Sequence, residues 1–140
     1  MRAVPESLRL AAILLAAGAI GGVASLIVLN DPDKGVAAAE ALTGGSVARG
    51  KAAIENRQCA ACHSIPGIAG AKGQVGSSLR GMGSRKTIAG LLRNDPDAMI
   101  AWLRDPQVIA PGNAMPDMGI EDREARDVAA YLYSLRSAPS

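Results

Sequence analysis

Large aromatic side chains are almost absent from this sequence. The chain has 140 residues and no phenylalanine, and besides one histidine its aromatic side chains are Trp102, Tyr131 and Tyr133. A soluble part of fewer than about 100 residues with so few large side chains buries too little apolar surface to fold unaided. We therefore expect the core to include a bound apolar group.

Charge, cysteine and histidine are also scarce. The formal net charge is only +2, which does not indicate nucleic-acid binding. The two cysteines and one histidine give three ligands, whereas a structural zinc site uses four Cys or His ligands. A cysteine-ligated iron–sulfur cluster usually requires four thiolates, twice the number present. Both kinds of metal site are therefore disfavoured.

These three scarce residues lie together in Cys59-Ala60-Ala61-Cys62-His63. C-x-x-C-H is the attachment signal for a c-type haem, in which both thiols bond to the porphyrin and the histidine ligates the iron. If the segment is helical, residues three apart share a face, so both thiols reach one edge of a flat ring. A thioredoxin-like motif needs a βαβ setting, which the pattern lacks, and a plain disulfide leaves the adjacent histidine unexplained. We predict one haem c, bound covalently through Cys59 and Cys62, with His63 as an axial ligand.

The N-terminal part contains an uncharged apolar run over residues 10–29. About 20 helical residues span roughly 30 Å, the thickness of the hydrocarbon core of a bilayer. Arg2 and Arg9 precede the run, which favours a cytoplasmic N-terminus at residues 1–9 and a single-pass anchor in the cytoplasmic membrane. The alternative is a signal peptide cleaved near residues 37–39. In both cases the rest of the chain is exported to the periplasmic side.

The remainder is predicted to be all-α, with a linker at 30–45 followed by a domain at 46–137. The linker is either a flexible coil or an extension of the preceding helix. Periodicity and capping residues predict helices at 46–58, 95–104 and 121–136, with a short helix at 87–92. Proline and six glycines make 64–84 a loop, and 106–119 is a second loop. We expect three to four helices around the haem.

A second axial ligand is needed if the haem is to carry electrons with little change in coordination. With the one histidine already assigned, a methionine is the natural candidate, and thioether ligation raises the reduction potential. Met115 lies in a loop with a proline at each end, Pro111 to Pro116, which suits the presentation of a ligand. Met118 and Met82 are the alternatives, whereas Met99 belongs to a predicted amphipathic helix.

From about Ser46 to Ser137, the chain resembles class I c-type cytochromes. Gly50 lies nine residues before the first cysteine, as in that family, although Ile54 replaces the usual aromatic residue. The resemblance implies that the C-terminal helix crosses at Gly50, close to Tyr131. The family's Gly-Pro-x-Leu is represented by residues 76–79, with Ser77 in place of proline. The Ser77 carbonyl is then expected to accept a hydrogen bond from the histidine Nδ1.

The resemblance extends to the methionine loop and the haem propionates. The loop is similar to the family's Pro-Gly-Thr-x-Met, with Asn113 in place of threonine. Arg80 or Arg85, together with Trp102, is similar to residues that contact propionates in relatives. The methionine loop and residues 65–67 most resemble small bacterial cytochromes tethered beside oxidases or dehydrogenases.

The resemblance implies a non-enzymatic electron carrier at the outer face of the cytoplasmic membrane. The expected donor is a quinol-oxidising complex or a dehydrogenase, and the expected acceptor is a terminal oxidase, with membrane lipid around residues 10–29 and no nucleic-acid partner. Two alternatives stay open. The first is a haem subunit fixed within an oxidase or dehydrogenase complex. The second is a sensor or enzyme with a displaceable sixth ligand.

Overall fold

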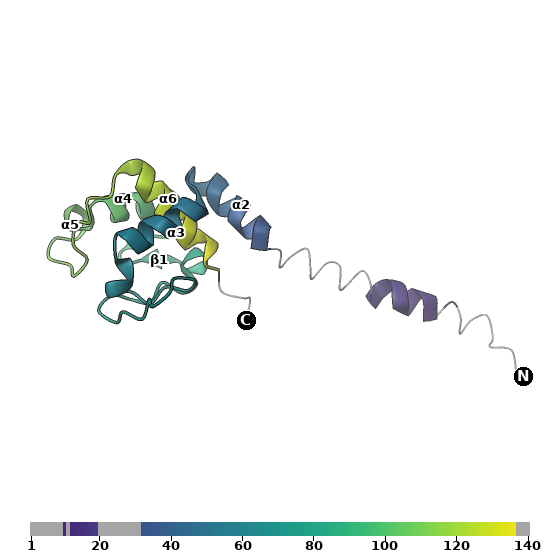
Figure 1. Ribbon diagram of the computed structural model, residues 1–140. Helices are drawn as coiled ribbons and strands as arrows, with labels where there is room; N and C mark the ends of the chain where they lie inside the picture. Colours follow the sequence, from purple (N-terminus) through teal and green to yellow (C-terminus); the bar gives the residue numbers. More distant parts are fainter. Residues whose placement is uncertain (1–9, 11, 20–31, 137–140) are drawn as a thin grey trace, which may run out of the picture. The chain divides into compact units, whose positions relative to one another are not determined.

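The computed structural model describes residues 10, 12–19 and 32–136 (Figure 1). The chain divides into two units, Met1–Pro32 and Asp33–Ser140. The described residues of the first unit are helical, and no helix in the described part of the chain is both long and apolar enough to cross a membrane. Most of the anchor predicted at 10–29, and all of residues 1–9, lie outside the described residues.

The second unit is mostly helical, as predicted. Its α-helices are α2 (Pro32–Thr43), α3 (Val47–Asn56), α4 (Pro96–Arg104), α5 (Pro106–Ile109) and α6 (Asp122–Ser134), with short 3-10 helices η1 (Cys59–Ala61) and η2 (Met82–Ser84) and two strands, β1 (Thr87–Ile88) and β2 (Leu92–Arg93). Helix α6 is central, because α3, α4 and η2 all pack against it. Its buried face includes Ala125, Val128, Ala129 and Leu132, which recur at helical spacing, as the periodicity behind the predicted helix at 121–136 requires.

Capping residues explain where α4 and α5 begin. The Asp95 carboxylate accepts a hydrogen bond from the Ala98 N–H at 2.9 Å, and the Asp105 carboxylate accepts one from the Val108 N–H at 3.0 Å. Each aspartate is followed by a proline, which suits the first helical position because it has no N–H to satisfy. The predicted helix at 95–104 is therefore confirmed, whereas the loop predicted at 106–119 begins with a short helix.

The crossing of α3 and α6 depends on Gly50, as predicted. A Cβ at Gly50 would lie 1.9 Å from the Asp127 carbonyl oxygen and 3.1 Å from the Tyr131 Cβ. Only a residue without a side chain allows the two helix backbones to approach this closely. Figure 1 shows the two helices crossing, and the contact brings Ile54 of α3 against the core, where only 1% of its surface is exposed.

The prediction of a short helix at 87–92 is wrong. Strands β1 and β2 form an antiparallel hairpin in which Thr87 pairs with Arg93 and Ile88 with Leu92. Ala89 and Gly90 both have positive φ angles, 51° and 73°, which α-helical geometry does not allow. The hairpin places Ile88 in the core, where it is 2% exposed.

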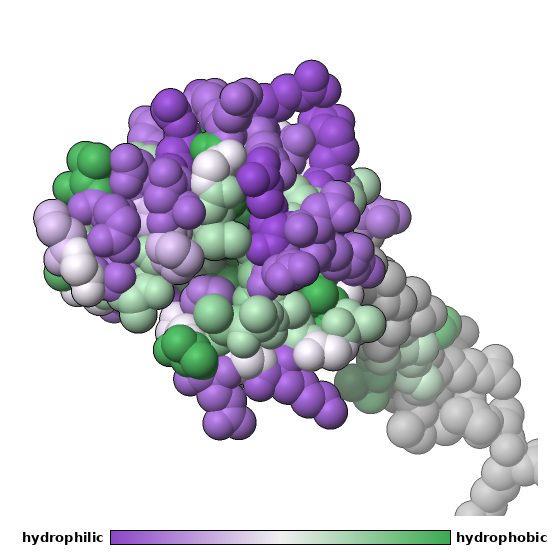
Figure 2. Space-filling view, turned by 60° about the vertical axis from the view of Figure 1, so that its left-hand side comes forward, coloured by the Kyte–Doolittle hydropathy of each residue, from purple (hydrophilic) through white to green (hydrophobic). Residues whose placement is uncertain are grey.

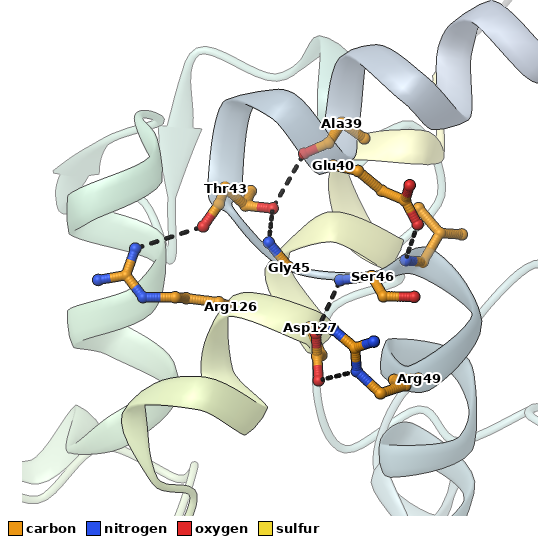
Figure 3. Close-up of polar contacts among 9 residues, drawn as sticks. Ala39, Glu40, Thr43, Gly45, Ser46, Arg49, Arg126 and Asp127 are labelled. Atoms are coloured by element: carbon orange, nitrogen blue, oxygen red, sulfur yellow. Dashed lines mark hydrogen bonds and ion pairs between the residues drawn. The ribbon is translucent and has the colours of Figure 1, made fainter.

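The linker predicted at 30–45 is not a flexible coil between Pro32 and Thr43, because these residues form α2. Ala39 and Thr43 are buried, with 4% and 2% of their surfaces exposed. The Glu40 carboxylate accepts a hydrogen bond from the Val47 N–H, so a side chain of α2 caps α3. The Arg126 side chain of α6 donates to the Thr43 carbonyl (Figure 3).

A buried carboxylate ties the same junction to α6. Asp127 accepts hydrogen bonds from the Ser46 N–H at 2.7 Å and from the Arg49 guanidinium, through Nε and Nη2, at 2.9 Å each (Figure 3). The bond to Arg49 is the main reason that the pKa of Asp127 lies below its ordinary value. Helices α2, α3 and α6 are therefore joined by side chains as well as by apolar packing.

Candidate functional site

The Cys59–His63 segment follows α3 directly and forms a tight turn. The predicted helix is of the 3-10 type, and it begins after Gln58, which has a φ angle of 55°. The N–H groups of Cys62 and His63 both donate to the Cys59 carbonyl, at 3.2 and 2.9 Å. Because residues three apart eclipse one another in 3-10 geometry, Cys59 and Cys62 share one face of the turn.

The cysteines do not have the features of a redox-active pair. Both thiols are free and partly buried. Burial raises the pKa of the Cys59 thiol above its ordinary value, whereas reactive C-x-x-C motifs lower the pKa of their attacking thiol. Cys59 also packs against the hydrophobic core, which suits a thiol that bonds to a hydrophobic ring.

The imidazole of His63 is oriented by the loop that follows it. Its Nδ1 lies 2.7 Å from the Ser77 carbonyl oxygen, so the hydrogen bond expected from the family resemblance is present although serine replaces proline. A carbonyl oxygen can only accept, so Nδ1 carries a proton, and in the neutral imidazole the lone pair is then on Nε2. This is the tautomer that a metal-ligating histidine needs.

Gly76 fixes the same ring from its flat side. A Cβ at this position would lie 2.3 Å from Cε1 and 2.6 Å from Nδ1 of His63, so any side chain would displace the imidazole. The Gly76 N–H also donates to the Cys62 carbonyl at 2.8 Å. The glycine-rich loop is thus folded against the cysteine motif.

Two cavities flank the cysteine motif. The larger, of about 260 Å³, is lined mainly by apolar side chains from α3, α4, α6 and the hairpin, including Ile54, Ile88, Leu103 and Val128. The smaller, of about 110 Å³, is lined by Cys59 and Cys62 and by residues of both predicted loops. The residues that line both cavities are Cys59, His63, Gly76, Ala114 and Met115. The two hollows are therefore bordered by one shared set of residues.

Met115 differs from the other candidate methionines in its position. Met82 and Met99 are buried and line only the larger cavity, and Met118 lines only the smaller one. Met115 is partly buried and lines both, as His63 does. Its loop is braced by Asn113, whose Oδ1 accepts a hydrogen bond from the Met115 N–H at 2.8 Å.

The expected propionate contacts are brought together only in part. Arg85 and Trp102 line the larger cavity, and Trp102 is 8% exposed. Arg80 is exposed and is not among the residues that line either cavity, and its carbonyl accepts a hydrogen bond from Arg85 at 3.0 Å. Arg85 is therefore better placed than Arg80.

Comparison with known proteins identifies the family. The sequence profile of the family described as Cytochrome c matches residues 47–136. This chain belongs to the cytochrome c family. The cytochrome domain is 38% identical over 91 residues to "Cytochrome c2 iso-2" of Magnetospirillum fulvum, a match that covers 56% of this chain and 90% of the relative.

The cytochrome domain is also similar to part of a larger protein. It is 40% identical over 91 residues to "Cytochrome c oxidase subunit 2" of Alkalihalophilus pseudofirmus, covering 63% of this chain but only 25% of the relative. A second oxidase subunit 2, from Bacillus sp. (strain PS3), is 31% identical over 94 residues, with 26% of its length covered. The chain thus spans about a quarter of these relatives. No solved structure gave a significant match.

As a cytochrome c, the chain carries a covalent haem c, and Cys59 and Cys62 provide the two thiols. The structure fits this group. Both thiols border an apolar cavity, and the bond from Nδ1 of His63 to the Ser77 carbonyl leaves Nε2 of the neutral imidazole available to a metal. Haem c supplies a one-electron couple when bound.

Sequence reasoning missed one residue of the cytochrome site and the structural role of another. Gly76 was noticed only as part of a family motif, although its contact with the imidazole demands a glycine. Gln107 was missed altogether, and its side chain hydrogen-bonds to the backbone around Met115. A glutamine one residue after a helix-starting proline carries no local signal of such a contact.

Proposed function

We propose that this cytochrome c is a one-electron carrier in which His63 and Met115 hold the haem iron from opposite sides. The observation that carries the proposal is that these two residues, alone among the histidine and the four methionines at 82, 99, 115 and 118, line both cavities beside the cysteine pair. Two strong axial ligands keep the coordination number the same in both oxidation states, which suits electron transfer.

The protein's own part in this function is to hold the ligands and exclude water. Ser77 and Gly76 orient the imidazole of His63. The apolar side chains of the larger cavity would surround the haem with a medium of low dielectric. A buried site with fixed ligands favours a high potential and a small structural change on reduction. Trp102 and Arg85 would hold the propionates.

Visible and magnetic circular dichroism spectra of the ferric holo-protein test the ligand assignment. We expect low-spin iron with a methionine–iron charge-transfer band that is lost in Met115→Ala. Met118→Ala and Met82→Leu, which change the alternative candidates, should keep the band. A high-spin wild-type protein that binds CO readily would contradict the carrier function and favour a sensor or enzyme with a displaceable ligand.

The proposed location is the outer face of the cytoplasmic membrane, with residues 10–29 as a single-pass anchor. Its support is the uncharged apolar length of that run and the arginines before it. The full chain should stay with membranes after a carbonate wash and leave them in detergent, whereas a chain that begins at residue 31 should be released. A full chain that behaves as the truncated one would contradict the anchor.

The proposed acceptor is a terminal oxidase, and the proposed donor is a quinol-oxidising complex or a dehydrogenase. The support is the similarity to proteins whose names are cytochrome c oxidase subunit 2. In a reconstituted membrane, the reduced holo-protein should be oxidised by the oxidase in an oxygen-dependent reaction that cyanide stops. If no such turnover is observed, the acceptor is not a terminal oxidase.

A second candidate function is a haem subunit fixed within such an oxidase, and the same relatives favour it. The surface bears on this choice. The face shown in Figure 2 is mostly hydrophilic with separate hydrophobic patches, and the exposed large hydrophobic residues of the second unit, Leu42, Val75, Leu91 and Val108, come from different segments. Permanent interfaces are typically broad and apolar, so this face suits a carrier. Stoichiometric co-purification with oxidase subunits in detergent would favour the fixed subunit.

A further inference from the structure

The loop that carries Met115 is held by side chains instead of by regular backbone pairing. Helix α5 begins at Pro106 and ends at Ile109, and the chain then reverses through Gly112, which has a φ angle of 80°. The segment of the loop that follows this reversal passes beside α5 at Met115. Nearly all of its hydrogen bonds to α5 come from two amide side chains.

The Gln107 amide uses all of its principal hydrogen-bonding groups on this loop. Its Nε2 donates to the carbonyl oxygens of Asn113 at 3.0 Å and Met115 at 2.7 Å. Its Oε1 accepts from the Gly112 N–H at 3.0 Å. The reverse orientation would place the NH₂ group against an N–H and the oxygen against two carbonyls, so only one orientation satisfies all three bonds.

The Asn113 amide makes a second set of hydrogen bonds within the same loop, and we call Gln107 and Asn113 together the clamp. Its Oδ1 accepts from the Met115 N–H, and its Nδ2 donates to the carbonyls of Pro106 at 2.9 Å and Ala110 at 2.7 Å. Both backbone polar groups of Met115 are therefore bound by side-chain amides, the N–H by Asn113 and the carbonyl by Gln107. The position of the Met115 backbone depends on these two residues.

We propose that Gln107 and Asn113 are positioning residues that hold Met115 in place as the sixth ligand, and that they set how easily an external ligand displaces it. This inference rests on the proposed function, in which Met115 ligates the iron. A ligand whose backbone is already fixed loses little conformational freedom when its sulfur binds. Without the clamp, the loop gains freedom when the sulfur leaves, so displacement becomes easier.

The test measures how strongly imidazole competes with Met115 for the ferric haem iron of the full-length holo-protein. Binding of imidazole is monitored through the change in the visible spectrum. A hydrogen bond contributes a net factor of about five, so loss of the contacts in Gln107→Ala or Asn113→Ala should raise imidazole affinity by about tenfold or more. The methionine–iron charge-transfer band should weaken in the same variants. Because both amides hold the backbone of the same residue, the double variant should show less than the sum of the two effects.

A matched control and a milder variant keep the test decisive. Gln74 is exposed and lines neither cavity, so Gln74→Ala should leave imidazole affinity unchanged. Gln107→Glu keeps the acceptor but cannot donate to two carbonyls, so it should shift the affinity in the same direction as Gln107→Ala even if the alanine variant loses its haem. Covalent haem content, measured as the pyridine haemochrome, should be equal in the variants compared.

Two results would overturn the proposal and they differ in meaning. If Gln107→Ala, Gln107→Glu and Asn113→Ala bind imidazole within twofold of Gln74→Ala while Met115→Ala removes the charge-transfer band, the clamp does not control the ligand. If Met115→Ala itself leaves the band and the imidazole affinity unchanged, Met115 is not the ligand, and the proposed function fails together with the clamp.

Discussion

Replacing Gly50 with alanine tests the close crossing of α3 and α6. The added Cβ would lie 1.9 Å from the Asp127 carbonyl oxygen and 2.5 Å from its carbon, whereas ordinary contact begins at 3.4 Å. The obstructing atoms are backbone, so α3 and α6 must separate by roughly 1.5 Å, because no side chain can rotate away. Overpacking of this kind costs about 1–3 kcal/mol, and we expect the upper end.

The same substitution also brings a gain, which has to be subtracted. Alanine is favoured over glycine inside a helix by about 1 kcal/mol. The net expectation for Gly50→Ala is therefore a loss of about 2 kcal/mol in the free energy of unfolding. The assay is guanidinium unfolding of the holo-protein at 25 °C, followed by far-UV circular dichroism, with covalent haem content matched between variants.

Gly35 in α2 offers a matched control. A Cβ there meets nothing within 4 Å, so Gly35→Ala should leave stability unchanged or raise it by up to about 1 kcal/mol. The two variants make the same chemical change within a helix, but the free energy of unfolding should fall only in Gly50→Ala. If Gly50→Ala is as stable as Gly35→Ala, the reasoning from the close crossing is refuted.

Two further predictions concern pH. The pKa of Asp127 is lowered, chiefly by its hydrogen bond to Arg49, so its stabilising contribution is present above its unfolded pKa of about 3.9 and is lost as the pH falls through the lower folded pKa. Asp127→Asn should destabilise the protein by about 1.5–3 kcal/mol at pH 7. Urea titrations of the two proteins should converge as the pH falls below about 3.9; a constant difference at all pH values would contradict this. Burial raises the pKa of Tyr133 to about 12, so the neutral phenol favours folding below its unfolded pKa of about 10, and this stability is lost as the pH rises toward 12. Thermal melts should show a smaller loss between pH 9 and 11.5 for Tyr133→Phe than for wild type, although the variant lacks the 2.9 Å hydrogen bond to Asn94; parallel losses would count against this origin.

The parts of the fold that the sequence predicted are those with local causes. Helix α4 follows from Asp95 and Pro96 at its start and Pro106 beyond its end, and α6 follows from its apolar stripe. The cysteine motif could be read for the same reason, because its function is contained in five consecutive residues. Local capping and periodicity are sufficient where no distant residue decides the conformation.

The parts that it did not predict depend on distant or unusual backbone contacts. The positive φ of Ala89 turns a helix-compatible sequence into a hairpin, and alanine gives no warning of that. The junction between α2 and α3 is held by Arg126 and Asp127, about 80 residues away along the chain. The Gln107 contact with the methionine loop likewise arises only once α5 has formed.

The glycine pair at 44–45 looks like a hinge in the sequence but does not act as one. Gly45 is pressed against the Arg126 carbonyl, with no room for a Cβ, and its N–H is bonded to the Thr43 hydroxyl at 3.2 Å. The 12 residues of α2 therefore move together with the haem domain, as a helix about 18 Å long that is fixed to α6 at its C-terminal end. A substitution that loosened Gly45 would release this helix from α6, so that the helix and the haem domain could reorient independently.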